Sequence, residues 1–334
     1  MKRLLARITV DRTVLLLLGT VLMASILPPR GTFRSVAEAV ADGGIITLFF
    51  LHGARLGREA ILEGARNWRL HLAVGAMTFV VFPLLGLAVH ALPGLAPPIA
   101  TGMLFLTLLP STVQSSIAFT ALAGGNVAAA VCSASFSNLA GIVLTPLLVA
   151  LLMTGATGGF SLDAVETIMV QLLLPFLAGH LLRPWIGAWV VRQKKLLGVV
   201  DRGSILLVVY TAFGAAVVGG LWQRLAPADL LLIAALSGGI LAAVLGLSHA
   251  LGRWLGLSRA DRIVLQFCGS KKSLASGVPM AGVLFPPAQV GAVILPLIFF
   301  HQIQLMICAM LAQRWRAGET DSKVASHRSG TPDG

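Results

Sequence analysis

Long apolar runs separated by short polar links constrain this chain more than any other feature of its sequence. A helix that crosses about 30 Å of hydrocarbon, at about 1.5 Å per residue, needs about 20 apolar residues. Runs this long and uniformly apolar exclude the alternating strands of a membrane barrel. We therefore predict an all-α integral membrane protein with ten transmembrane helices. The ten runs lie near residues 11–28, 39–56, 69–92, 97–123, 126–153, 164–183, 201–221, 228–252, 261–285 and 288–312.

The scarcity of charged residues supports this class. Only 11% of the residues are charged, whereas a soluble domain carries about 25%. A net charge of +12 could indicate a nucleic-acid-binding protein, but the basic residues lie in the short links between apolar runs. This placement is typical of residues that determine membrane topology and not of a surface that binds the phosphates of a nucleic acid. The expected partners are the lipid bilayer and a small-molecule substrate, and no nucleic acid.

The distribution of lysine and arginine predicts the orientation of the chain. If all ten runs cross the membrane, 20 of the 25 basic residues fall on one side and three, Arg30, Arg34 and Arg224, fall on the other. The last two, Lys271 and Lys272, lie inside the ninth run. The positive-inside rule then places both termini on the cytoplasmic side of the cell (inner or plasma) membrane. The first apolar run lacks a small-x-small cleavage site and ends at Pro28-Pro29, so it reads as a retained first span and not as a signal peptide.

Five spans in each half imply that the two halves insert with opposite orientation. We predict a first repeat over residues 1–155, an inverted second repeat over 156–316 and a disordered cytoplasmic tail over 317–334. The run from Asn126 aligns without gaps with the run from Gln289. This alignment is the internal similarity expected of an inverted repeat.

Matching polar interruptions occur in the fourth and ninth runs, PSTVQSS at 110–116 and CGSKKSLASG at 268–277. Interrupted helices at corresponding places in two inverted halves are the best sequence indication of a secondary transporter's binding site. The plain alternative for the fourth run is a helix kinked at Pro110, with its serines bonded back to its own carbonyls. The paired interruption favours a site. The predicted site residues in the fourth run are Thr112, Gln114, Ser115 and Ser116.

Two adjacent lysines, Lys271 and Lys272, lie near the middle of the ninth run, flanked by Ser270 and Ser273. A lysine at the centre of a bilayer costs at least about 2.5–3.5 kcal/mol, so we expect at least one of the two to face a polar cavity. Equally, one lysine could bind the broken ends of the fourth run as a permanent structural cation. The acidic residues, Asp42 among them, fall near the ends of the predicted spans. Helix carbonyls, a bound anion or loss of a proton must therefore balance the lysines.

The fifth and tenth runs add further candidates. Asn138 and His301 are costly to bury and align with each other, and Ser137 and Gln302 are their neighbours. All four are included in the predicted substrate or ion site. We expect no enzymatic activity, because the sequence has no HExxH, GxSxG or P-loop motif, and we expect no cofactor. The cysteines have no CxxC spacing, so a metal site is not predicted.

Three runs carry a resemblance to a known family: STVQSSIAFTALAGGNVAAAVCSASFSNL (111–139), FCGSKKSLASGVPMA (267–281) and FFHQIQL (299–305). They resemble the bile acid:sodium symporter family, and specifically its SBF-like branch, which includes a divergent vertebrate solute-carrier member. The resemblance covers nearly the whole chain. It implies a panel domain (spans 1, 2, 6 and 7) and a core domain (spans 3–5 and 8–10). In that fold spans 4 and 9 are unwound and cross near the midplane, and the substrate lies between the domains.

The resemblance also implies where sodium ligands would lie, and this sequence departs from that pattern. The Ser-Asn pair of sodium-coupled relatives falls on Ser116-Ile117, and two hydroxyl positions fall on Ala130 and Ala134. The shared glutamate falls on Ser270 or Lys271, and the glutamine falls on Leu274 or Ala275. Because a hard cation prefers oxygen ligands and usually a carboxylate, sodium coupling in the usual manner is not expected.

These observations predict a secondary transporter that moves a small organic, anionic solute by alternating access. The sequence also allows two alternatives. One is a cation or proton exchanger with the same architecture, and the other is a non-transporting membrane regulator of ion or envelope homeostasis.

Overall fold

The computed structural model describes residues 12–55, 67–153, 162–224 and 226–328. All regular elements in these four ranges are helical, and no strand occurs in them. The all-α prediction is therefore confirmed. The elements in chain order are α2 (Arg12–Ile26), α3 (Gly31–Arg55), α5 (Trp68–Ala76), the π-helical segment η1 (Met77–Val81), α6 (Phe82–His90), α7 (Pro97–Leu108), α8 (Gln114–Leu122), α9 (Val127–Leu152), α10 (Leu162–Arg192), α11 (Lys194–Val218), α12 (Leu221–Arg224), α13 (Pro227–Trp254), α14 (Arg259–Cys268), α15 (Leu274–Leu284) and α16 (Pro287–Arg328).

Six helical stretches in the described part of the chain are long and apolar enough to cross a membrane. Three shorter apolar helices accompany them, in α2, α7 and α15. A chain with this many apolar helices of spanning length is an integral membrane protein. The six stretches are Gly31–Arg55, Trp68–His90, Val127–Leu152, Lys195–Val218, Pro227–Trp254 and Pro287–Arg316.

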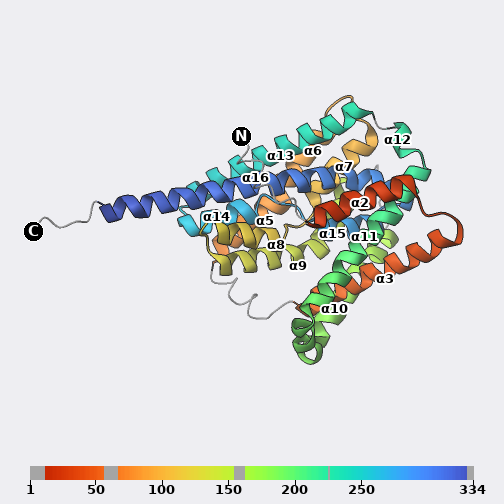
Figure 1. The fold of residues 1–334 in the computed structure, drawn as a ribbon, viewed down its shortest axis with the longest axis horizontal. Helices are drawn as coiled ribbons and strands as arrows, with labels where there is room; N and C mark the ends of the chain where they lie inside the picture. The colour runs from red at the N-terminus through yellow and green to blue at the C-terminus, as the bar shows by residue number, and fades with distance from the viewer. Residues whose placement is uncertain (1–11, 56–66, 154–161, 225, 329–334) are drawn as a thin grey trace, which may run out of the picture.

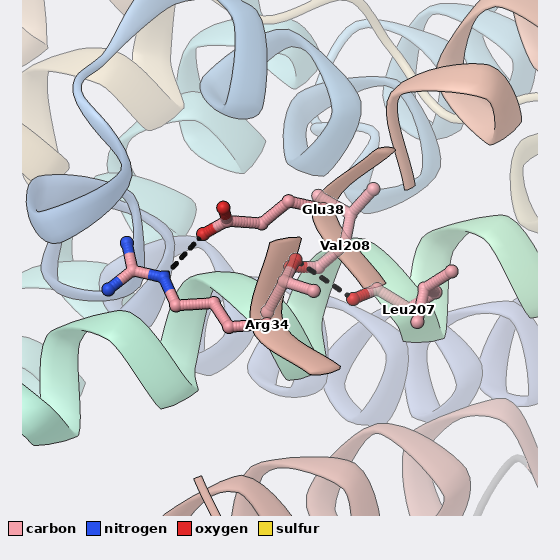
Figure 2. Close-up of polar contacts among 5 residues, drawn as sticks. Arg34, Glu38, Leu207 and Val208 are labelled. Carbon is pink, nitrogen blue, oxygen red and sulfur yellow. Dashed lines mark hydrogen bonds and ion pairs between the residues drawn. The ribbon is translucent and has the colours of Figure 1, made fainter. Parts of the chain in front are cut away.

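Helix α3 begins at Gly31, well before the apolar run predicted over 39–56. Its first turns mix charged and small residues, so they fall below the hydropathy of a span, yet nothing in them prevents a helix. Arg34 donates from Nε to Glu38 one turn later at 2.8 Å, which supports this first part (Figure 2). The expectation that Asp42 lies near a span end is therefore wrong, because Asp42 lies close to the centre of the 25-residue helix.

Helices α2, α3, α10 and α11 pack together in the right half of Figure 1. The closest contact is between α3 and α10, where two glycines let the backbones meet. A Cβ atom on Gly53 would lie 1.9 Å from the carbonyl oxygen of Phe176, and one on Gly179 would lie 1.9 Å from that of Phe50. Small residues allow such an approach between membrane helices. This interface depends on glycine at both positions.

The remaining long helices form a second group, on which α11 packs through α15 and α16. Gly291 of α16 lies against α11, since a Cβ there would be 2.6 Å from the Cβ of Ala216. A continuous set of buried apolar side chains runs through both groups of helices. The two groups therefore share one core.

The last helix, α16, continues as far as Arg328. It thus extends through much of the segment 317–334 for which the sequence predicts a disordered tail, and the structure differs from the prediction here. The segment between Trp315 and Arg328 contains no proline, so its backbone can continue the helix that the apolar part begins.

Candidate functional site at two interrupted helices

Both predicted interruptions are breaks in helical structure. Helix α7 ends at Leu108 and α8 begins at Gln114, while α14 ends at Cys268 and α15 begins at Leu274. At the first break Leu109 has an extended conformation, with φ −77° and ψ 156°, immediately before Pro110. A residue before proline is pushed out of the helical region by the proline ring. The sequence therefore ends α7 at this point.

The two breaks lie against each other. The backbone N–H of Ser273 donates to the carbonyl of Pro110 at 2.9 Å, and Ser111 Oγ donates to the carbonyl of Cys268 at 2.5 Å. Gly141 of α9 permits the close approach of the first break, because a Cβ there would lie 2.6 Å from the Cβ of Pro110. The backbone groups freed by each break are thus partly satisfied by the other.

The ammonium group of Lys272 is fully buried and binds three backbone carbonyls. Its Nζ donates to Thr107 O at 2.7 Å, to Leu109 O at 2.6 Å and to Thr78 O at 2.7 Å. The first two acceptors are at the carboxyl end of α7, where the helix dipole is negative. The third lies in η1, and a π-helical turn shifts the regular pairing of helix carbonyls. An ammonium has three donors, so all its hydrogen-bonding capacity is used.

The backbone of Lys272 is also held on both sides. Its N–H donates to Gln304 Oε1 at 2.9 Å, and its carbonyl accepts from Gln304 Nε2 at 2.9 Å. The ring of Phe82 lies 4.2 Å from Nζ, within the range of a cation–π contact. Three hydrogen bonds from a charged donor, at about 1.5–3 kcal/mol each, can offset the several kcal/mol that burial of an ammonium costs.

Lys271 has a different environment, although it is the adjacent residue. Its side chain is also 0% exposed, but Nζ has no hydrogen-bond acceptor in the described part of the chain. The ring centroids of Phe119 and Phe267 lie 4.2 Å and 5.5 Å from Nζ. Cation–π contacts supply about 0.5–2 kcal/mol each, which is less than the cost of burying an ammonium without a partner. The two lysines therefore differ in how well their charges are compensated.

Hydroxyl side chains surround the amino ends of α8 and α15. Thr112 Oγ1 is hydrogen-bonded to Ser116 Oγ at 2.9 Å and accepts from Ser115 Oγ at 2.8 Å. Ser273 caps α15, since its Oγ accepts from the N–H of Ser276 at 3.1 Å. The partly positive amino ends of two half-helices thus lie in a polar setting that suits an anion.

Helix α9 connects the two breaks. Ser137 Oγ accepts from the N–H of Ser111 at 2.9 Å. Asn138 donates from Nδ2 to the carbonyl of Ser111 at 3.1 Å and accepts through Oδ1 from Ser276 Oγ at 2.9 Å. One amide side chain therefore contacts the first break and the start of α15.

The structure brings most of the predicted site residues together at these breaks, but not all of them in one contact network. Ser116 donates to the carbonyl of Phe267 at 2.9 Å, and Ser270 donates to that of Gln266. His301 Nδ1 lies 2.9 Å from Gln304 Nε2. Gln114 is exposed at the first turn of α8. Gln302 is half-buried, and its Oε1 has no partner among the described residues.

Sequence reasoning missed three contributors to the site. Gln304, Ser111 and Ser276 make the contacts between elements, although only their neighbours were predicted. Ser276 carries a detectable signal, because it lies three residues after Ser273 in a cap pattern. The carbonyl acceptors of Lys272 carry none, because every residue has a backbone carbonyl.

Comparison with known proteins adds the class of protein. Residues 11–317 match the SBF-like CPA transporter family, and the chain therefore belongs to this family. It is 56% identical over 319 residues to "Uncharacterized protein PA2026" of Pseudomonas aeruginosa, covering 94% of this chain and 96% of that protein. It is 52% identical over 321 residues to "Putative symporter YfeH" of Escherichia coli (strain K12), covering 96% of each. "Sodium/bile acid cotransporter 7" of Rattus norvegicus is 27% identical over 274 residues, 80% of each chain.

Family membership confirms the predicted resemblance and the class of membrane transporter. The relatives are named as transporters and symporters and not as enzymes, which agrees with the expectation of a non-enzyme. These names describe the relatives and not this chain.

Proposed function

We propose that this protein is a secondary active transporter that moves a small organic anion by alternating access and does not require sodium. The proposal includes ten membrane spans in two inverted repeats, residues 1–155 and 156–316, with both termini in the cytoplasm. The solute would bind between the group formed by α2, α3, α10 and α11 and the group that contains the interrupted helices.

Similar support of the two breaks favours the inverted repeat. In the first half Asn138, on the long helix after the break, binds the backbone of Ser111. In the second half Gln304, on the long helix after the break, binds the backbone of Lys272. Each interruption is thus held by a side-chain amide from the next helix. Support of both breaks by a side-chain amide is expected if the two halves are copies of one repeated unit.

The observation that carries the proposal is the buried ammonium of Lys272 at the contact of the two breaks. It supplies a fixed positive charge next to the position where the family resemblance implies a glutamate in sodium-coupled relatives. A cation at this point would repel a sodium ion and attract an anion. The partly positive amino ends of α8 and α15 add a setting suited to a carboxylate, sulfonate or phosphate.

The other positions of the implied sodium site also lack ligands. Ala130 and Ala134 are 0% exposed and present only methyl groups there. Ser116 already donates its hydroxyl to the carbonyl of Phe267. Sodium prefers several oxygen ligands, usually including a carboxylate. These side chains do not supply that set.

The test is a thermal-stability screen of purified protein against small carboxylates, sulfonates and phosphates, in sodium buffer and in choline buffer. The proposal predicts that at least one anion raises the melting temperature equally in both buffers. A shift that needs sodium contradicts the sodium-independent mechanism. No shift with any anion favours the non-transporting regulator.

A second candidate function, cation or proton exchange, is favoured by the position of Asp42. This carboxylate lies at mid-helix in α3 and is exposed, with Glu38 one turn before it. An acidic residue at the depth of a membrane span is by default a functional candidate. For an exchanger, Asp42→Asn abolishes proton-coupled cation flux in proteoliposomes. For the anion transporter proposed here, wild-type protein shows no such flux with sodium, potassium or calcium.

A further inference from the structure

The adjacent lysines Lys271 and Lys272 have opposite environments, and that of Lys271 points to a proton site. The Gly269–Ser273 link carries both Lys271 and Lys272 between α14 and α15. Lys272 has three carbonyl acceptors. Lys271 is equally buried and has none among the described residues. The structure thus compensates one ammonium fully and leaves the other without an acceptor.

The groups that face Lys271 do not supply the missing charge. Helix α8 contributes the ring of Phe119, and α14 contributes the ring of Phe267 and the thiol of Cys268. Helix α16 contributes the thiol of Cys308. None of these is a carboxylate, and neither ion pair found among the described residues involves Lys271.

The side chains that α8, α14 and α16 place around Lys271 are largely apolar. Phe267 and Cys308 belong to a buried cluster packed by Phe119 and Trp315. The remaining members of that cluster are Ala123, Ile263 and Ala312. A neutral amine fits such a pocket, whereas an ammonium keeps only weak contacts with the two rings. The geometry therefore favours the neutral form in this conformation.

We infer that Lys271 is the proton-binding group of this transporter, neutral in the conformation described here and protonated when the interrupted helices move and admit water. This rests on the proposed function, since it assigns the coupling ion to the same site. When the site dries, one N–H bond of the ammonium breaks, its electron pair stays on nitrogen and the proton passes to water. When the site hydrates, water returns the proton and restores the ammonium.

This exchange couples naturally to an organic anion. The protonated Lys271 adds a second positive charge beside Lys272, and this charge raises the affinity for an anion at the contact of the two breaks. Loss of the proton removes that charge and favours release. A monovalent anion would then move together with one proton, with no net charge crossing the membrane.

Thermal stability as a function of pH tests the inference with the proton itself as the probe. If Lys271 is neutral in the folded protein and charged in the unfolded chain, the unfolded state binds more protons and stability rises with pH. We would measure the difference in melting temperature between the wild type and Lys271→Met at each pH. This difference should shift in favour of the wild type by about 2–5 °C over two pH units between pH 6 and pH 9. Lys195→Met removes an exposed lysine at the start of α11 and should leave the wild-type pH dependence intact.

Parallel curves for the wild type and Lys271→Met would overturn the inference. If Lys271→Met does not fold, Lys271→Gln replaces it in the same comparison, with the same two outcomes. The measurement needs no transported solute, so its failure is separate from that of the proposed function. A pH-dependent difference without any effect of anions rejects only the transporter. Anion binding together with parallel curves rejects only Lys271 as its proton site.

Discussion

Replacing Lys272 by methionine removes the ammonium that binds the carboxyl end of α7 while it keeps a side chain of similar length. Three buried carbonyls, those of Thr78, Thr107 and Leu109, lose their donor. An unsatisfied buried group costs about 1–3 kcal/mol, so the gross loss is about 3–9 kcal/mol. The variant no longer has the cost of burying an ammonium, and this gain offsets part of the loss of stability. We expect Lys272→Met to lower the free energy of unfolding by about 3–5 kcal/mol, as found when one member of a buried charged network is removed.

The adjacent lysine provides the matched control. Lys271→Met removes the same group from the same link and breaks no hydrogen bond among the described residues. It also removes the cost of burying this amine, so its stability at neutral pH should equal or exceed that of the wild type. The assay is unfolding in mixed micelles by increasing sodium dodecyl sulfate, followed by tryptophan fluorescence, with size-exclusion profiles as a check on folding. Equal stability of Lys272→Met and wild type, or equal losses for the two lysine variants, would refute the assigned difference in roles.

Two further substitutions test other parts of the structure in the same unfolding assay. Gly53→Ala should destabilise the protein by about 1–3 kcal/mol, because its Cβ would lie 1.9 Å from the carbonyl oxygen of Phe176. The control is Gly43→Ala, which has nothing within 4 Å of the added Cβ and should be neutral or stabilising. Equal effects of the two substitutions would argue against the close α3–α10 contact. Gln304→Leu should cost about 2–4 kcal/mol because it removes two hydrogen bonds to the backbone of the second break. Gln302→Leu removes a side-chain oxygen that has no partner among the described residues, so it should change stability by less than about 1 kcal/mol. A ranking in the opposite order would contradict the role of Gln304 in holding the second break.

The helical segments and both interruptions could be predicted because they depend on local sequence. A run of about 20 apolar residues forms a helix wherever it enters a membrane. At Pro110 the proline removes a backbone donor, and the hydroxyl residues that follow can supply replacement hydrogen bonds, so the local sequence favours an interruption. The tail and the start of α3 could not be placed in this way. Their residues allow a helix without being apolar, so hydropathy sets no boundary at Gly31 or Arg328.

The division of roles between the lysines lay beyond the sequence. Lys271 and Lys272 are chemically identical neighbours, and only the path of the link directs one toward carbonyls and the other toward rings. One carbonyl that binds Lys272 belongs to Thr78, which is 194 residues away in the chain. Its π-helical turn contains no proline or glycine that would mark it in the sequence. Long-range backbone contacts of this kind appear only when the helices are assembled.

Solute uptake without sodium is the most direct test of the central claim, that a buried lysine takes the place of the sodium charge. Liposomes that contain the purified protein would be loaded with the anion that gives the largest thermal shift. Uptake of the labelled anion would then be measured in sodium and in choline media. The account predicts equal rates in both media, and loss of uptake in a folded Lys272→Arg variant, whose larger guanidinium cannot keep the three carbonyl contacts. Uptake that strictly requires sodium and persists when both lysines are replaced would contradict it.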